Sequence, residues 1–213
     1  MNVRRIDLTS NDSFLFTKVN KDSANKEIAK YPEGRQASAI IAILWIAQKQ
    51  NNGWLSESAI SHVSNFLNMQ KIRTLEIATF YTMFNLSPVG KYHIQLCGTT
   101  PCMLCGAESL KKVLNNEIGE VGSLTKDNLL SWVEVECLGA CCNAPMVQIN
   151  DYYYEDLDET SFKKIIKDLK SGKEIKTGSY KGRLTSEPSK DPIILLDDEI
   201  EKINIKRIKP GLK

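Results

Sequence analysis

Six cysteines are the residues of this chain whose types and spacing best support chemistry. Four of them form two short pairs: Cys97 and Cys102 in the run C-G-T-T-P-C, and Cys137 and Cys141 in the run C-L-G-A-C. Two short pairs that lie far apart in a chain commonly converge on one metal centre, because each pair occupies one tight loop. Four thiolates bind either a tetrahedral zinc ion or an iron–sulfur cluster. The sequence therefore predicts a metal centre at these four cysteines.

The spacing within each pair favours an iron–sulfur cluster over zinc. Structural zinc sites commonly use C-x₂-C pairs, whereas the gaps here are four and three residues long. Wider gaps suit a cluster of two metal ions with bridging sulfides. Gly98, Thr99 and Thr100 in one loop, and Gly139 in the other, allow backbone N–H groups to approach the cluster sulfurs. Such hydrogen bonds raise the reduction potential. Zinc and a metal-free dithiol are the alternatives at this point.

Cys105 and Cys142 lie beside the pairs and permit other ligand sets. Cys97, Cys102 and Cys105 have the C-x₄-C-x₂-C spacing of plant-type ferredoxins, with Cys137 as a distant fourth ligand. A helix is expected almost directly after Cys105, which leaves little loop for a third ligand. Cys102 and Cys105 also form a C-x-x-C at a helix start, as in thiol–disulfide enzymes, but the other four cysteines would then have no role. We expect Cys105 to be a small buried apolar residue and Cys142 to point away from the metal centre.

The two histidines are expected to be structural. His62 falls in a predicted helix, and His93 lies on a predicted strand shortly before Cys97. A Rieske-type centre needs two histidines on one iron, and these two fall in separate predicted domains. The sequence has neither G-x-G-x-x-G nor G-x-x-x-x-G-K-[ST]. We therefore expect no nucleotide site on this chain.

Composition excludes several classes of protein. The chain has 213 residues, of which 28 are basic and 26 acidic, giving a net charge of +2. This balance argues against binding of nucleic acid through a broad basic patch. No run approaches the ~18 consecutive apolar residues of a membrane helix, and the acidic residues near the start argue against a transit peptide. We expect an intracellular protein, in which cysteines serve metal or redox chemistry rather than disulfides.

The elements that position the cysteines divide the chain into four segments. Residues 1–30 are polar and are expected to wrap loosely, so that ordered structure begins near Tyr31. Residues 31–90 are expected to form a helical domain that docks on a partner, because its apolar residues exceed what three short helices bury among themselves. Its three helices are predicted from Gln36 to Lys49, after the N-cap Ser56, and from Lys71 to Phe84.

Residues 91–172 carry the cysteine pairs and predict an α/β domain. The expected order is β-α-β-β-α, which is the order of a thioredoxin-like domain. Its strands and helices are predicted at Tyr92–Leu96, around 110–114, at Trp132–Val135, at Met146–Ile149, at Tyr152–Tyr154 and through Phe162–Leu169. Each cysteine pair begins where a strand ends, at one rim of the sheet, where sites on such folds occur. Residues 173–213 are expected to form a polar arm that is extended on a partner surface or partly disordered.

The runs C-G-T-T-P-C and E-C-L-G-A-C-C-N-A-P resemble the thioredoxin-like [2Fe–2S] ferredoxin family, in particular the 24-kDa subunit family of NADH–quinone oxidoreductase, respiratory complex I. The runs G-W-L-S, A-T-F-Y-T-M-F and P-V-G-K-Y-H-I, which begin at Gly53, Ala78 and Pro88, are similar to the same family. So is the placing of a helical domain before the ferredoxin domain. The resemblance covers about residues 31–169, and G-R-L-T-S-E-P at 182–188 also has the character of the family.

The resemblance implies one [2Fe–2S] cluster bound by Cys97, Cys102, Cys137 and Cys141. It implies a one-electron carrier in the NADH dehydrogenase module of complex I, which accepts an electron from the flavin of a partner subunit. FMN and NADH would lie on that partner, so the chain would be part of an oxidoreductase without being catalytic alone. The expected location is cytoplasmic and peripheral, on the inner face of the bacterial cell membrane or the mitochondrial matrix side, with no direct membrane insertion.

Two other functions remain open at this point. The equivalent subunit of a soluble NAD-linked hydrogenase or formate dehydrogenase would use the same module for the same purpose. A zinc-stabilised interaction module would have no redox role, and it would be colourless where a [2Fe–2S] protein is red-brown.

Overall fold

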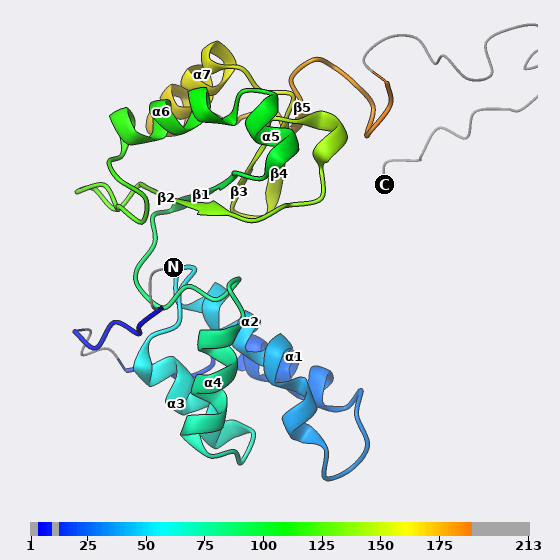
Figure 1. Cartoon of the computed structure of the whole chain (residues 1–213). Helices are drawn as coiled ribbons and strands as arrows, with labels where there is room; N and C mark the ends of the chain where they lie inside the picture. Colours follow the sequence, from blue (N-terminus) through cyan, green and yellow to red (C-terminus); the bar gives the residue numbers. More distant parts are fainter. Residues whose placement is uncertain (1–3, 10–12, 189–213) are drawn as a thin grey trace, which may run out of the picture. The chain divides into compact units, whose positions relative to one another are not determined.

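The computed structural model describes residues 4–9 and 13–188 (Figure 1). These residues form seven α-helices and a mixed sheet of five strands, which confirms the predicted α/β class. The chain divides into two compact units. Within residues 4–9 and 13–188, the first unit comprises the residues up to Ile94 together with Ile118–Val133, and the second comprises Gln95–Glu117 together with the residues from Glu134 onward. No helix of the described residues is long and apolar enough to cross a membrane.

The first unit begins with a helix that the sequence patterns did not predict. Helix α1 spans Lys18–Ile28, and the Thr17 side chain caps it by accepting a hydrogen bond from Asn20 N at 3.3 Å. Phe14 and Ala24 are buried in the helical core, so ordered structure begins well before Tyr31. The apolar signal of α1 is weak because Ala24 is its buried residue and the rest of the helix is polar or partly exposed.

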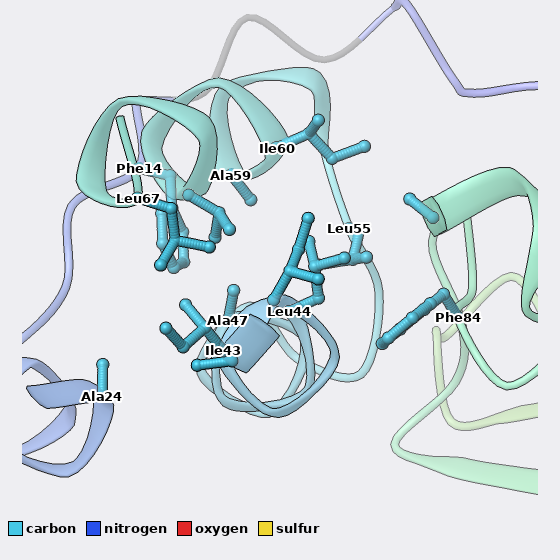
Figure 2. Packing of buried hydrophobic residues seen from close by; sticks show 14 of the residues in the cluster. Phe14, Ala24, Ile43, Leu44, Ala47, Leu55, Ala59, Ile60, Leu67 and Phe84 are labelled. Carbon is cyan, nitrogen blue, oxygen red and sulfur yellow. The ribbon is translucent and has the colours of Figure 1, made fainter. Parts of the chain in front are cut away.

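The three predicted helices are present, with adjusted bounds. A short 3₁₀ turn, Gln36–Ala39, precedes α2 at Ile40–Gln50, and α3 spans Glu57–Phe66. The Ser56 side chain accepts a hydrogen bond from Ala59 N, which confirms the predicted N-cap. Figure 2 shows the α2 side chains, among them Leu44 and Ala47, pointing toward the side chains of α3 across a core of buried apolar residues.

Helix α4 spans Lys71–Phe80 and is shorter than predicted, because the chain turns after Phe80. The guanidinium of Arg4 donates hydrogen bonds to the carbonyl oxygens of Thr79 and Tyr81, each at 2.9 Å, and to that of Phe84. Carbonyl groups at a helix C-terminus have no partner within the helix. A side chain from the start of the chain therefore stabilises this end, which no local pattern reveals.

The sheet has the strand order β2-β1-β3-β4-β5. The bounds are Tyr92–Cys97 for β1, Leu130–Val135 for β2, Val147–Ile149 for β3, Tyr152–Glu155 for β4 and Gly178–Ser179 for β5. Strands β3 and β4 pair antiparallel, with Val147 opposite Tyr154, and Asn150 in the turn has a φ of +54°. An asparagine tolerates this left-handed conformation. The predicted hairpin is thus confirmed.

The second unit contains three helices. They are α5 at Thr100–Leu104, α6 at Ala107–Glu117 and α7 at Glu159–Lys170. Figure 1 shows α6 and α7 on one face of the sheet, where they pack against each other. Asp158 caps α7 by accepting from Ser161 N at 2.7 Å, and Gly172 follows the helix with a φ of +68°. These local signals explain why α7 is predictable from sequence.

The first part of the segment predicted as an extended arm is structured. Strand β5 pairs parallel with β4, and the chain then turns back through residue 188. Residues 189–213, which the same prediction covers, lie outside the described residues.

Candidate metal centre

Two loops at the ends of strands carry the four predicted ligands. Strand β1 ends at Cys97 and α5 carries Cys102. Cys137 comes two residues after the end of β2, and Cys141 opens a short 3₁₀ turn, Cys141–Asn143. The side chains of Cys97 and Cys102 are buried, whereas Cys137 and Cys141 are exposed. One pair therefore lies inside the domain and the other faces solvent.

The exposed pair has a defined geometry. The Sγ atoms of Cys137 and Cys141 lie 3.3 Å apart. Gly139 N donates to Cys137 Sγ at 3.4 Å, and the φ of +80° at Gly139 places that N–H within the loop. The Tyr153 hydroxyl donates to Leu138 O at 2.8 Å, which ties the same loop to β4. The two thiols are thus held together without any disulfide between them.

Hydrogen bonds also join the two loops to each other. Thr99 Oγ1 lies 3.4 Å from Cys97 Sγ, and the same side chain hydrogen-bonds to Cys137 in the other loop. In return, the backbone N–H of Leu138 in the second loop hydrogen-bonds to Cys97. Thr99 was expected to offer its backbone N–H to the sulfurs, but the hydrogen bond of its side chain to the opposite loop was not predicted. Leu138 was not singled out from the sequence, because its contact does not follow a local pattern.

The pKa values of the buried pair separate the two thiols. Burial, the hydrogen bond with Cys97 and the charge of Cys97 raise the pKa of Cys102 to about 12. Burial also acts to raise the pKa of Cys97, but hydrogen bonds from Thr99, Leu138 and Cys102 outweigh it, and the pKa lies below its usual value. Thiolates rather than thiols are metal ligands. The protein thus supplies hydrogen bonds that stabilise negative charge at Cys97.

The exposed pair shows the same division. The backbone N–H of Gly139 and hydrogen bonds from Cys141 and Thr99 lower the pKa of Cys137. The hydrogen bond to Cys137 and partial desolvation raise the pKa of Cys141, as do the charges of Cys137 and Cys97. The charge of Cys141 likewise acts on Cys102. The sulfurs of one loop therefore act electrostatically on those of the other.

This donor set fits a two-metal cluster. Among the described residues, no group of three or more His, Cys, Asp or Glu side chains converges on a point that would hold one metal ion. The sulfurs instead form two pairs on two loops that are hydrogen-bonded to each other. A [2Fe–2S] cluster takes four thiolates in total, and two pairs of thiols match two irons. The ligand set predicted from sequence is thus brought together by the fold.

The other cysteines and the histidines differ in their placement. Cys105 is exposed at the C-terminus of α5, so the prediction that it is buried is wrong; the pattern of a helix start does not say which face meets solvent. Cys142 is also exposed.

His62 accepts a hydrogen bond from Phe16 N at 3.3 Å and lies among aromatic rings. His93 is buried, with Nδ1 2.8 Å from the Ser131 hydroxyl.

A carboxylate lies directly beside the first cysteine loop. Glu134 accepts from Lys111 Nζ at 2.6 Å, and its side chain lies against the Cα of Gly98. A Cβ at Gly98 would be 2.9 Å from Glu134 Cδ and would overlap Oε1. Glycine at this position therefore leaves room for a negative charge close to Cys97.

An α/β domain with four cysteines on two strand-end loops defines the class: an iron–sulfur protein built on a thioredoxin-like fold. The family whose model matches residues 24–170 is described as thioredoxin-like [2Fe–2S] ferredoxin, and the chain belongs to this family.

Two curated relatives, each named as a subunit of NADH-quinone oxidoreductase, are similar over most of their length. The relative from Rickettsia typhi is 52% identical over 159 residues, which is 74% of this chain and 94% of the relative. The relative from Rickettsia prowazekii carries the same name and is 51% identical over 158 residues, covering 74% of this chain and 89% of the relative.

A solved structure has a similar fold at low identity. A crystal structure of NAD⁺-reducing [NiFe]-hydrogenase in the H₂-reduced state superposes with a TM-score of 0.54 and 22% identity. The match covers 60% of this chain and 22% of the hydrogenase chain. At this identity the likeness concerns the fold.

Proposed function

We propose that this chain is the [2Fe–2S] electron carrier in the NADH dehydrogenase module of respiratory complex I. The observation that carries the proposal is the pairing of four thiols on two strand-end loops that are hydrogen-bonded to each other. The two Rickettsia relatives, both named as a subunit of NADH-quinone oxidoreductase, support it, because they match almost end to end at about half identity.

Cys97, Cys102, Cys137 and Cys141 would hold the cluster. When bound, the cluster supplies a one-electron redox couple, while the protein supplies position and electrostatics. Thr99 and the backbone N–H groups of Leu138 and Gly139 donate hydrogen bonds to the ligand sulfurs. Such bonds stabilise negative charge on sulfur and raise the reduction potential. The carboxylate of Glu134 acts in the opposite direction.

The exposure of one cysteine pair sets the side on which electrons enter. Cys97 and Cys102 are each 1% exposed, so protein covers them, whereas Cys137 and Cys141 face solvent. A partner can therefore approach the centre closely from the loop that holds the second pair. We propose that this partner is a flavin-bearing subunit that binds FMN and oxidises NADH, and that it passes one electron to this chain.

An exposed apolar surface on the first unit supports docking of the helical region. These exposed apolar side chains are Ile72 and Phe80 on α4 and Tyr81 and Met83 in the turn after it, which we call the α4 apolar surface; Phe80 is 78% exposed, and its ring contacts that of Tyr81. Exposed apolar patches commonly mark interaction sites. Residues 31–90 would then be the docking domain, 91–172 the cluster domain, and the whole chain would be peripheral on the inner face of the cell membrane.

Reduction by NADH tests the proposal. The chain alone should not be reduced by NADH, whereas the complex with the flavin-bearing subunit should show NADH-dependent bleaching of the cluster absorbance. A single chain that bound NADH at micromolar concentration and became reduced would contradict the assignment of roles.

The docking surface has a matched test. Phe80→Asp should abolish complex formation without unfolding the chain, since the side chain is already in solvent. Val121→Asp is the control, because Val121 is also exposed, at 51%, but lies apart from α4 in the sequence. Equal binding by both variants would place docking elsewhere.

The likeness to the hydrogenase fold favours one alternative, the equivalent subunit of a soluble NAD-linked hydrogenase or formate dehydrogenase. Affinity purification of the chain from its own cells separates the two. Complex I predicts co-purification of quinone-dependent NADH oxidation, whereas the alternative predicts hydrogen- or formate-dependent reduction of NAD⁺.

A further inference from the structure

A buried ion pair connects strand β4 to the segment that follows β5. The side chains of Arg183 and Asp156 are 10% and 2% exposed. Arg183 Nε donates to Asp156 Oδ2 at 2.8 Å, and Nη2 donates to Oδ1. The Ser179 hydroxyl donates to the same Oδ2 at 2.6 Å. Two parallel hydrogen bonds between a guanidinium and a carboxylate are among the stronger polar contacts in proteins.

The same guanidinium also reaches the turn that carries Cys141. Arg183 Nη2 donates to Cys142 O at 2.7 Å, and Nη1 donates to Glu187 O at 3.0 Å. The carbonyl that it holds belongs to the residue directly after Cys141. Arg183 therefore contacts the cysteine turn through the backbone and not through a sulfur.

Asn143, the last residue of that turn, makes a second set of connections. Its Nδ2 donates to Glu155 Oε2 at 2.7 Å and to Thr185 O at 2.8 Å. Its carbonyl accepts from Asp156 N at 2.8 Å. The turn is thus bonded to β4 on one side and to the segment after β5 on the other.

The backbone of Asp156 shows that this arrangement is demanding. Asp156 has a φ of +56°, which is uncommon for a residue other than glycine. Such conformations persist where the surroundings fix them. Here the N–H bonds to the cysteine turn and the carboxylate bonds to Arg183, so both ends of the residue are held.

We propose that Arg183 is a positioning residue for the cluster: paired with Asp156, it fixes the turn Cys141–Asn143 so that Cys141 Sγ stays beside Cys137 Sγ. This inference rests on the proposed function, because it takes Cys141 as a cluster ligand. Groups that orient metal ligands without touching the metal commonly change metal affinity by roughly 10- to 100-fold when they are removed.

A purely structural role makes a different prediction. If the ion pair only anchored the segment after β5, its loss would lower stability but leave the electronic signature of the cluster unchanged. The two roles are therefore separated by spectroscopy and by the rate of iron release, rather than by melting temperature.

Two variants of the full chain test the proposal. Arg183→Met removes the charge and all hydrogen bonds of the guanidinium. Arg183→Lys keeps a charge for Asp156, but its compact ammonium cannot reproduce the planar geometry that reaches Asp156 and Cys142 O together. The control is Lys170→Met, which removes an ion pair with Glu117 on the surface of the same unit.

The readouts are the EPR spectrum of the reduced chain and the rate of iron release to a chelator. Both Arg183 variants should release iron roughly tenfold faster than the wild type and show shifted or broadened g values. Lys170→Met should match the wild type within about twofold, since exposed pairs contribute little. Wild-type spectra and release rates in Arg183→Lys would overturn the proposal, as would equal effects of the control.

Hydrogen exchange in the metal-free chain gives a readout that does not need the cluster. The N–H groups of Asn143 and Asp156, which bond to Ala140 O and Asn143 O, should exchange roughly tenfold faster in Arg183→Lys than in Lys170→Met. Unchanged exchange rates in the metal-free Arg183→Lys chain would overturn the proposal, even if the wild-type chain binds iron. If the wild-type chain bound no iron but Arg183→Lys showed the predicted change in exchange, the proposed function would be contradicted. The role of Arg183 in positioning the turn would still be supported.

Discussion

Protonation of His93 should destabilise the fold in mild acid. Burial lowers the pKa of His93 from 6.5 to about 4, and the side chain lies on β1, four residues before Cys97. The unfolded chain therefore binds a proton at a higher pH than the folded chain does. Because stability falls with falling pH wherever the unfolded state binds more protons, the contribution of neutral His93 is present above pH 6.5 and is lost as the pH falls toward 4.

The size of the effect follows from the shift. The pKa of His93 differs by about 2.5 between the unfolded and the folded chain. At about 1.4 kcal/mol per pKa unit, the free energy of unfolding changes by about 3 kcal/mol in total. Most of this loss occurs between the two pKa values. Relative to pH 8, the free energy of unfolding should fall by about 1 kcal/mol at pH 5.5 and by about 2 kcal/mol at pH 5.

Urea unfolding of the wild type and of His93→Asn measures this contribution. Asparagine places an uncharged amide near the position of Nδ1, which faces the Ser131 hydroxyl. Subtracting the free energy of unfolding of the variant from that of the wild type cancels two other effects of pH, since both proteins share them. These are the titration of His62 and the loss of a cluster in acid. The wild type should lose about 1 kcal/mol more than the variant between pH 8 and pH 5.5. Parallel pH profiles would refute the assignment of a buried, neutral His93.

Two further predictions concern the cysteines and the first loop. Cys105→Ser should keep the cluster and change the free energy of unfolding by less than about 1 kcal/mol, since the side chain is exposed. The Cys141→Ser/Cys142→Ser double variant should lose the cluster. A double variant is needed because Cys142 lies next to Cys141 and offers a replacement thiolate. Visible absorbance and iron content check both, and a native spectrum in the double variant with loss of the cluster in Cys105→Ser would favour the plant-type ligand set. Gly98→Ala should displace the Glu134 carboxylate, because the new Cβ would lie 2.9 Å from Glu134 Cδ. The free energy of unfolding should fall by less than about 1 kcal/mol, since the acidic side chain is partly exposed and flexible. Redox titration should show a higher midpoint potential in both Gly98→Ala and Glu134→Gln, because the first moves the negative charge away from the first loop and the second removes it. A lower potential in either variant would contradict this electrostatic role.

Local patterns predicted the elements that carry the site. Helix α7 has apolar residues at helical spacing, a capping Asp158 and a closing Gly172, and all three signals appear in the structure. The cysteine pairs begin where β1 and β2 end, so strand prediction alone placed them at one edge of a sheet.

Long-range contacts account for what the sequence did not reveal. Helix α1 is held by a core to which it contributes few apolar residues. The segment after β5 is ordered through the Arg183–Asp156 pair, whose members lie 27 residues apart. Hydrogen bonds from Thr99 and Leu138 to the opposite cysteine loop likewise depend on the folded arrangement. Sequence spacing predicted the ligand set and the N–H group of Gly139, but not the contacts between the two loops.

Iron and acid-labile sulfide per chain, measured on anaerobically purified protein together with EPR after reduction, test the central claim most directly. Membership of the [2Fe–2S] family predicts two irons and two sulfides per chain and the EPR signal of a reduced two-iron cluster. Stoichiometric zinc with negligible iron, and no EPR signal after reduction, would contradict it.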